Sequence, residues 1–334
     1  STGTPITAYG TRITALFWRA FTLREHLWQR RDLAGRFAAI RPEGTLTPGR
    51  GQNAKGWGPA TDVVYRTGES FTLSSRTDVP AQATWLREIN PQYLLSLPSN
   101  LIALARHCRD RAIVLPALRE VRSYGEVAGA ELRRICREVW DVPVKDMYSA
   151  QEVGYMALQC PEHEHYHVMS EGVLLEVIDD AGRVCAPGEV GRVVVTTLHN
   201  FAMPLIRYEV GDRAELGGPC ACGRGLPVIR RVLGRHRNML TLPDGRQAYP
   251  SFPAELWGDI VPIQQLQLVQ TTRTRIEARL VAERPLTSDE AAMFVHRLRE
   301  RLGHPFDIAV CYMEHIPRAA SGKYEDFISE ICGG

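Results

Sequence analysis

Short apolar runs alternate with helical periods along residues 93–148, starting with Tyr93-Leu94-Leu95-Ser96-Leu97. This run predicts a buried strand, and Leu101, Leu104 and Ala105 after it share one face of a helix. The next predicted elements are a strand over 118–123, a helix over 130–140 and a strand over 143–148. Because strands joined by helices pair in parallel, the stretch predicts an α/β fold whose parallel sheet is covered on both faces.

Two further stretches follow the predicted parallel sheet. Residues 168–232 alternate apolar and polar positions, which predicts antiparallel strands over 173–178, 192–198 and 205–210. After the polar segment 234–238 come predicted strands over 264–269, 275–281 and 307–312 and a helix over 288–302. These elements indicate a separate α+β domain of roughly a hundred residues. We therefore expect a large domain over 1–235 and a small C-terminal domain over 236–334.

Composition and charge exclude several classes of protein. The 334 residues are 44% apolar and 23% charged, which is typical of a globular chain of two domains. Lys and Arg number 40 against 38 Asp and Glu, a net charge of +2 that gives no reason to expect nucleic acid as a partner. No apolar run reaches the ~20 residues of a membrane span, and the first residues do not resemble a secretory signal. Eight cysteines favour reduced thiols and a cytoplasmic protein.

A tight thiol pair and a cluster of cysteine and histidine predict a metal site. Tetrahedral zinc takes four nitrogen or sulfur ligands, commonly from two short segments that the fold brings together. The expected ligands are Cys160, Cys220, Cys222 and His167, with His165 as the second choice of histidine. The alternative is that the thiols are buried fillers and the histidines lie on the surface. We favour a structural zinc site, because the sequence Cys-x-Cys-Gly suits an apolar core poorly.

Four other positions carry groups suited to a nucleotide. Ser1-Thr2-Gly3-Thr4 combines hydroxyls with a glycine that lets backbone N–H groups approach a phosphate. Glu152 follows a predicted parallel strand and can hold a divalent cation, and Asp212 can accept hydrogen bonds from ribose hydroxyls. Lys323 lies beside a glycine and can meet a developing negative charge. Taken singly, each has an ordinary alternative: a disordered terminus, a solvated carboxylate or an exposed lysine.

Taken together and in order, these segments resemble the motifs of the adenylate-forming (ANL) superfamily, most closely its phenylacetate–CoA ligase-like branch. The longest match is Asn-Phe-Ala-Met-Pro-Leu-Ile-Arg-Tyr-Glu-Val-Gly-Asp at 200–212. Tyr148-Ser149-Ala150-Gln151-Glu152 matches the aromatic-x-x-x-Glu motif, with Gln151 in place of the usual Thr or Ser. The remaining matches are Ser1–Pro5 to the tail of the phosphate loop, Gly234-Arg235 to the hinge motif and Ser321-Gly322-Lys323 to the C-terminal lysine motif. The resemblance spans the whole chain.

The resemblance implies an AMP-forming acid–CoA ligase with a large adenylating domain and a mobile small domain. ATP and an aryl or other small hydrophobic carboxylic acid would give an acyl adenylate and pyrophosphate, and coenzyme A would then displace AMP. An amine or a carrier protein is the alternative acceptor, and a homodimer is compatible with the resemblance. A zinc-stabilised nucleotide-binding relative without catalysis is the alternative of another class. The presence of Glu152, Asp212 and Lys323 argues against it.

The resemblance also implies a role for each matched residue. The residues expected to cradle the β- and γ-phosphates are Ser1, Thr2, Gly3 and Thr4. Those expected on the adenine side are Ser123, Tyr124, Gly125 and Glu126, with Tyr148 and Ser149 beside the nucleotide. Glu152 would bind Mg²⁺, Asp212 the ribose, Arg235 the ribose or a phosphate, and Lys323 the carboxylate and α-phosphate. Rotation about the hinge would then remove Lys323 and admit the acceptor.

Two features differ from the pattern of the family. The chain begins inside the phosphate loop, so we expect the part of the large domain that precedes this loop in the family to be absent from this sequence, together with some acyl-pocket residues. In the hinge, Arg237 stands where the family usually places an acidic residue. The hinge of this chain therefore carries a positive charge.

Overall fold

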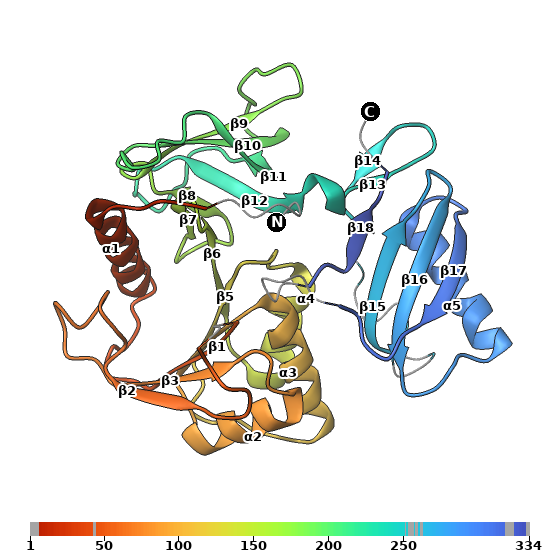
Figure 1. Ribbon diagram of the computed structural model, residues 1–334, viewed down its shortest axis with the longest axis horizontal. Coiled ribbons are helices and arrows are strands. Elements are labelled where there is room, and N and C mark those ends of the chain that lie inside the picture. The colour runs from red at the N-terminus through yellow and green to blue at the C-terminus, as the bar shows by residue number, and fades with distance from the viewer. Residues whose placement is uncertain are drawn as a thin grey trace. The chain divides into compact units, whose positions relative to one another are not determined.

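The computed structural model describes residues 7–42, 45–250, 252, 257, 260, 263–317 and 324–331. The chain divides into two compact units, Ser1–Gly234 and Arg235–Gly334, each described by itself below (Figure 1). Two of the predicted functional segments, residues 1–4 and Lys323, lie outside the described residues. In the part that is described, every helix is too short or too polar to cross a bilayer.

A twelve-stranded sheet organises the first unit. Its parallel part consists of β3 (Glu69–Ser74), β1 (Phe37–Arg41), β4 (Tyr93–Ser96), β5 (Glu120–Tyr124) and β6 (Val144–Ala150), in that spatial order. β2 (Gln52–Lys55) pairs antiparallel with β3 at one edge. Beyond β6 the sheet continues with β7 (Gly154–Gln159), β8 (Tyr166–Val168), β12 (Val228–Arg235), β11 (Tyr208–Leu216), β10 (Val190–Thr197) and β9 (Val173–Ile178). The sheet thus joins a parallel half to a largely antiparallel half, as the sequence predicts.

Helices cover both faces of the parallel half. Helices α2 (Val79–Ile89), α3 (Pro98–Asp110) and α4 (Ala130–Trp140) gather on one face, as Figure 1 shows. Their apolar side chains, among them Leu86, Leu104 and Ile135, pack against the strands in one buried cluster. Helix α1 (Arg12–Trp28) covers the other face, where Phe21 packs with Phe37 and Met147. The expected two-sided cover is confirmed.

One predicted strand is wrong in its position. The pattern predicts a strand over 205–210, but β11 begins at Tyr208 and runs to Leu216. Arg207 has a left-handed φ of +48°, which a β-strand does not allow, and its N–H donates to the side chain of Thr196 at 3.0 Å. The N–H of Leu205 likewise donates to the Thr197 hydroxyl, at 3.2 Å. Threonine side chains therefore satisfy the backbone of a loop where an apolar pattern predicts a strand.

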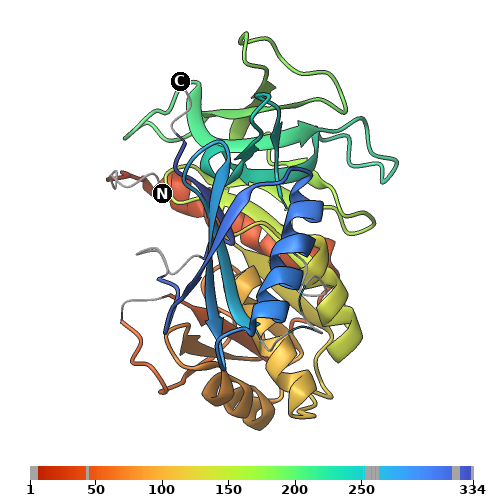
Figure 2. The same ribbon diagram turned by 90° about the vertical axis from the view of Figure 1, so that its right-hand side faces the viewer.

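The second unit is a smaller α+β domain. Its four-stranded sheet has the order β17 (Asp307–Tyr312), β16 (Arg275–Ala282), β15 (Ile263–Gln270) and β18 (Phe327–Ser329). Helix α5 (Ser288–Leu302), the blue helix of Figure 2, packs Phe294 and Leu298 against the sheet. Before the sheet come the short 3-10 helix η1 (His236–Asn238) and a hairpin of β13 (Leu240–Thr241) and β14 (Gln247–Ala248).

Candidate active site

Two tyrosine–carboxylate hydrogen bonds join β6 and the turn after it to β11. The Tyr148 hydroxyl donates to Oδ2 of Asp212 at 2.9 Å. The Tyr208 hydroxyl donates to Oε1 of Glu152 at 3.2 Å. Side chains 56 and 64 residues apart in sequence therefore meet in one site. Tyr148, Glu152 and Asp212 were predicted from their motifs, whereas Tyr208 lies within the longest motif but received no predicted role.

The backbone at both places is shaped by glycine. Glu152 lies in the turn between β6 and β7, and Gly154 after it has a φ of +98°. Gly211, directly before Asp212, has a φ of +86°, which an L-residue with a side chain adopts at a cost. The register of β10 and β11 shifts here, since Arg192 faces Arg213 while Val194 faces Glu209. Such a bulge bends the strand and redirects a side chain, in this case that of Asp212.

The carboxylates can bind the groups that the resemblance implies. An ionised carboxylate offers about four lone-pair sites, of which the Tyr208 hydrogen bond occupies one at Glu152. Oxygen ligands of this kind are what Mg²⁺ prefers. A carboxylate is equally suited to accept hydrogen bonds from vicinal hydroxyls, as expected of Asp212, which lies in the middle of β11.

The loop expected on the adenine side has structural partners of its own. Ser123 is fully buried and donates to Oδ1 of Asp146 at 2.6 Å. Glu126 accepts hydrogen bonds from the N–H and the hydroxyl of Ser99, at 2.8 and 3.1 Å, and so caps the N-terminus of α3. Tyr124 packs against the buried cluster that includes Phe37, and Gly125 has a φ of +78°. The side chains of this loop are therefore engaged within the protein, which leaves its backbone around Gly125 to face a ligand.

The other two predicted positions lie at element ends. Ser149 follows Tyr148 in β6, where the register with β7 shifts. Arg235 ends β12 and is the first residue of the second unit. Their places in the chain are compatible with the expected contacts, which stay predictions.

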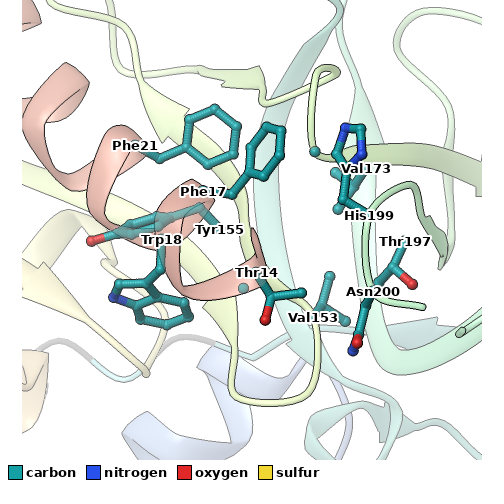
Figure 3. A pocket seen from close by; sticks show the side chains of 12 residues that line it. Thr14, Phe17, Trp18, Phe21, Val153, Tyr155, Val173, Thr197, His199 and Asn200 are labelled. Atoms are coloured by element: carbon teal, nitrogen blue, oxygen red, sulfur yellow. The ribbon is translucent and has the colours of Figure 1, made fainter. Parts of the chain in front are cut away.

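A small aromatic cavity lies beside the turn that carries Glu152 (Figure 3). Val153 and Gly154 form part of its wall, and α1 contributes Phe17, Trp18 and Phe21. The ring of Phe17 stacks on that of His199, with centroids 4.4 Å apart and planes at 10°. The apolar wall facing the Glu152 turn was not predicted, although aromatic residues four apart at 17 and 21 indicate a helix face that packs.

The predicted zinc ligands also come together. Sγ of Cys160, Cys220 and Cys222 and a ring nitrogen of His167 all lie within 4.8 Å of one another. Nε2 of His167 is 3.2 Å from Sγ of Cys222. The two segments are the β7–β8 hairpin and the loop between β11 and β12. Thiols and imidazole in a set of four are the donors that tetrahedral zinc takes.

A second donor set overlaps the first. It shares Cys160 and Cys220 and adds His163 and His165. Nδ1 of His163 lies 3.6 Å from the sulfur of each of these cysteines. His163 was not among the predicted ligands, because the spacing along 160–167 does not show which histidine turns inward.

Arg224 stabilises a thiolate at this pair of cysteines. Burial acts to raise the pKa of Cys222, but hydrogen bonds from the backbone and side chain of Arg224 lower it. Metal binding requires thiolates, so this environment suits the binding of a metal ion.

Comparison with known proteins places this chain among CoA ligases. The CapK C-terminal domain family matches residues 253–330. The phenylacetate-coenzyme A ligase of Thermus thermophilus is 30% identical over 312 residues, which cover 81% of this chain and 69% of the relative. The phenylacetate-coenzyme A ligase of Escherichia coli is 25% identical over 76% of this chain. The match spans 62% of that relative, less than two thirds of its length.

Solved structures share the fold at lower identity. A 2-hydroxyisobutyryl-CoA ligase in the postadenylation state aligns with a TM-score of 0.69 and 20% identity, over 98% of this chain and 74% of its own. An anthranilate CoA ligase in complex with anthranoyl-AMP aligns with a TM-score of 0.67 and 16% identity, over 97% of this chain and 64% of its own. Fold and motif residues together define an adenylate-forming enzyme. Within that class, the chain belongs to the phenylacetate–coenzyme A ligase family of ATP-dependent, AMP-forming acid–CoA ligases. The resemblance seen in the sequence is confirmed.

Proposed function

We propose that the protein activates an aryl or other small hydrophobic carboxylic acid with ATP and transfers the acyl group to coenzyme A. The observation that carries this proposal is the pair of hydrogen bonds Tyr148–Asp212 and Tyr208–Glu152, because they gather the most specific motifs into one site. In the first step a carboxylate oxygen attacks the α-phosphorus and pyrophosphate leaves. In the second step the coenzyme A sulfur attacks the acyl carbon, its proton passes to solvent and AMP leaves.

The roles of the individual residues follow from charge. An anionic acid attacking an anionic phosphate meets repulsion, which bound cations and N–H donors offset. Glu152 would hold Mg²⁺, which supplies charge neutralisation at the phosphates. Asp212 would accept from the ribose hydroxyls, residues 1–4 would bind the outer phosphates, and Lys323 would meet the charge that spreads in the transition state.

The class of acid is supported by the relatives. Those from Thermus thermophilus and Escherichia coli are named phenylacetate-coenzyme A ligases, and phenylacetate is a small aryl acid. The aromatic cavity beside Val153 does not bear on this choice, because its space of about 30 Å³ is close to the volume of a single water molecule.

We further propose that zinc stabilises the antiparallel half of the large sheet. Cys160, Cys220, Cys222 and His167 supply four donors, which would leave no open position for a substrate. The metal would link the β7–β8 hairpin to the loop between β11 and β12. Its contribution is to folding, because the site holds no ligand position for chemistry.

A screen of carboxylic acids on the full-length protein tests the proposed function. We expect pyrophosphate release that depends on the acid, AMP formation stimulated by coenzyme A, and a thioester product. Acid-dependent release without stimulation by coenzyme A would indicate an amine or a carrier protein as acceptor. Nucleotide binding without release for any acid would indicate a non-catalytic relative and contradict the proposal. The homodimer stays a prediction, which light scattering on the same sample would check.

A further inference from the structure

The cluster of cysteine and histidine in the first unit contains more metal ligands than one ion takes. Two sets of four donors share the sulfurs of Cys160 and Cys220, whereas a tetrahedral zinc ion binds only four donors in all. The inner set consists of Cys160, Cys220, Cys222 and His167, and the outer set of Cys160, Cys220, His163 and His165. The proposed structural zinc uses the inner set alone, so the two imidazoles of the outer set are available to a further ion.

The ring of His163 lies where a metal ion bound to two of these sulfurs would need it. Nδ1 of His163 is 3.6 Å from Sγ of Cys160 and 3.6 Å from Sγ of Cys220. Zinc bonds of about 2.3 Å to sulfur and about 2.0 to 2.1 Å to nitrogen, at a tetrahedral angle, place the ligand atoms about 3.6 Å apart. A neutral ring nitrogen that accepts hydrogen bonds has a single lone pair, so it cannot bond well to both thiols. The two equal distances therefore fit one face of a coordination tetrahedron.

His165 brings an unsatisfied nitrogen to the same place. A ring nitrogen of His165 lies within 4.8 Å of the other donor atoms of the outer set. Its ring stacks on that of His163, with centroids 4.9 Å apart and planes at 11°. Nε2 of His165 is buried and has no hydrogen-bond partner among the described residues. An unpaired buried polar atom costs free energy, which coordination to a metal ion would remove.

The two sets differ in exposure and in charge. Cys160 and His167 of the inner set are fully buried, whereas His163 of the outer set is exposed and His165 is half-buried. Three thiolates and Zn²⁺ at the inner set sum to a net charge of −1, which attracts a second cation. The outer set adds only neutral imidazoles to sulfurs that already bind the first ion, so it should hold its ion more weakly.

We propose that the outer set binds a second divalent metal ion, with the sulfurs of Cys160 and Cys220 bridging the two ions. A thiolate sulfur has several lone pairs and can bond to two ions at once. Zinc, cobalt and cadmium are the class of ion that fits, because the donors are sulfur and imidazole nitrogen. The inner ion stays bound during purification, and the outer ion exchanges with the solvent. The proposal rests on the proposed zinc site and is independent of the ligase reaction.

Titration of the full-length protein, loaded with one zinc per chain, with Co²⁺ tests the proposal. We expect about one further ion to bind while the zinc is retained, with a sulfur-to-cobalt charge-transfer band in the near ultraviolet. His163→Ala and His165→Ala should each weaken cobalt binding at least about tenfold and keep the zinc. The matched control is His296→Ala, which removes a histidine of α5 whose side chain is 69% exposed and should leave cobalt binding unchanged.

The possible outcomes separate this inference from the zinc site on which it rests. Cobalt that binds without the charge-transfer band, or equally well to every variant, would be adventitious and would overturn the inference. Replacement of zinc by cobalt one for one, or no cobalt binding at all, would also overturn it while the inner zinc site stands. Loss of the zinc itself in His163→Ala or His165→Ala would show that the outer set is the structural site, and both proposals would be wrong.

Magnetic coupling tests whether the two ions share sulfurs. In wild-type protein loaded with cobalt at both sets, bridging thiolates should couple the two ions. The electron paramagnetic resonance signal per cobalt should then fall well below that of the form with zinc at the inner set and cobalt at the outer set. Equal signals per cobalt in the two forms would overturn the bridged arrangement. This measurement needs no variant, so it decides the question even where an alanine variant fails to fold.

Discussion

At the scale of single residues, Asp146 shows how burial changes acidity next to the site. It is a buried residue of β6, and its carboxylate accepts hydrogen bonds from Ser123 and Tyr166, at 2.6 and 2.7 Å. Burial raises the pKa of Asp146 to about 6, although both hydrogen bonds act to lower it. At pH values between the ordinary pKa of an aspartate and about 6, Asp146 is protonated in the folded protein and ionised in the unfolded chain.

This difference predicts a loss of stability as pH rises. Because the unfolded state binds fewer protons between about pH 4 and pH 6, the free energy of unfolding should fall by up to about 3 kcal/mol over that range. Asp146→Asn removes the titration, keeps a neutral amide of similar shape and should not show this fall. Urea unfolding of both proteins at pH 4.5 and 7 measures the difference. If the free energy of unfolding depended on pH in the same way in both proteins, folding would not raise the pKa of Asp146 and the prediction would be wrong.

The residue scale also shows why the candidate site was only partly predictable. Tyr148, Glu152 and Asp212 stand in motifs whose residue types report their chemistry. Tyr208 and His163 stand in the same stretches, but their roles depend on which side chains the bulge and the hairpin turn inward. Orientation of this kind is set by long-range pairing, which a single sequence does not display.

At the scale of elements, local patterns predicted most of the boundaries. The helix expected over 130–140 and the strand over 173–178 are found at those residues, because their apolar periods and end signals are local. The strand order around β8 and β12 was not predicted, since these neighbours are about 60 residues apart and pair through register alone.

Helix α1 is attached to β5 by a buried ion cluster. Glu25 pairs with Arg31 at 2.5 Å and with Arg122, and Arg31 also pairs with Glu120 at 2.5 Å. Burial alone would raise the pKa of Glu25, but Arg122 and Arg31 hold it well below its ordinary value. The attachment of the helix therefore depends on the pairing of charges that are almost completely buried.

Removing one charge from this cluster should be costly. We expect Glu25→Gln to lower the free energy of unfolding by about 3–5 kcal/mol, because it leaves two buried arginines undercompensated. Arg24, on the same helix, forms the matched exposed pair with Glu171, and the two side chains are 29% and 47% exposed. Glu171→Gln should change stability by less than about 1 kcal/mol. Denaturant unfolding compares the two, and similar effects would mean that the cluster is not the anchor of α1.

The proposed zinc site would likewise join two elements. Metal analysis of the purified protein should find about one zinc per chain, and none in Cys220→Ser/Cys222→Ser, because both donor sets include the sulfur of Cys220. His167→Ala should lose the metal, while His165→Ala should keep it. A wild-type protein that is well folded without metal would contradict the proposed zinc site. Retention of zinc in His167→Ala would instead indicate the donor set that contains His163.

At the scale of the whole molecule, the predicted chemistry is divided between the two units. Tyr148, Glu152, Tyr208 and Asp212 belong to the first unit, and Lys323 belongs to the second. Nucleotide binding should therefore survive changes that remove the charge supplied by the second unit.

Lys323→Ala tests this division directly. A group that stabilises developing charge typically contributes about 3–4 kcal/mol to the transition state, so acid-dependent pyrophosphate exchange should fall a hundredfold or more. ATP affinity, measured by calorimetry, should change little, because Glu152, Asp212 and the residues proposed to bind the outer phosphates all belong to the first unit. Thioester formation from supplied acyl adenylate should also persist, since that step needs no charge at the α-phosphate. Equal losses of ATP binding and exchange would show that Lys323 serves binding, and the division of labour between the units would be wrong.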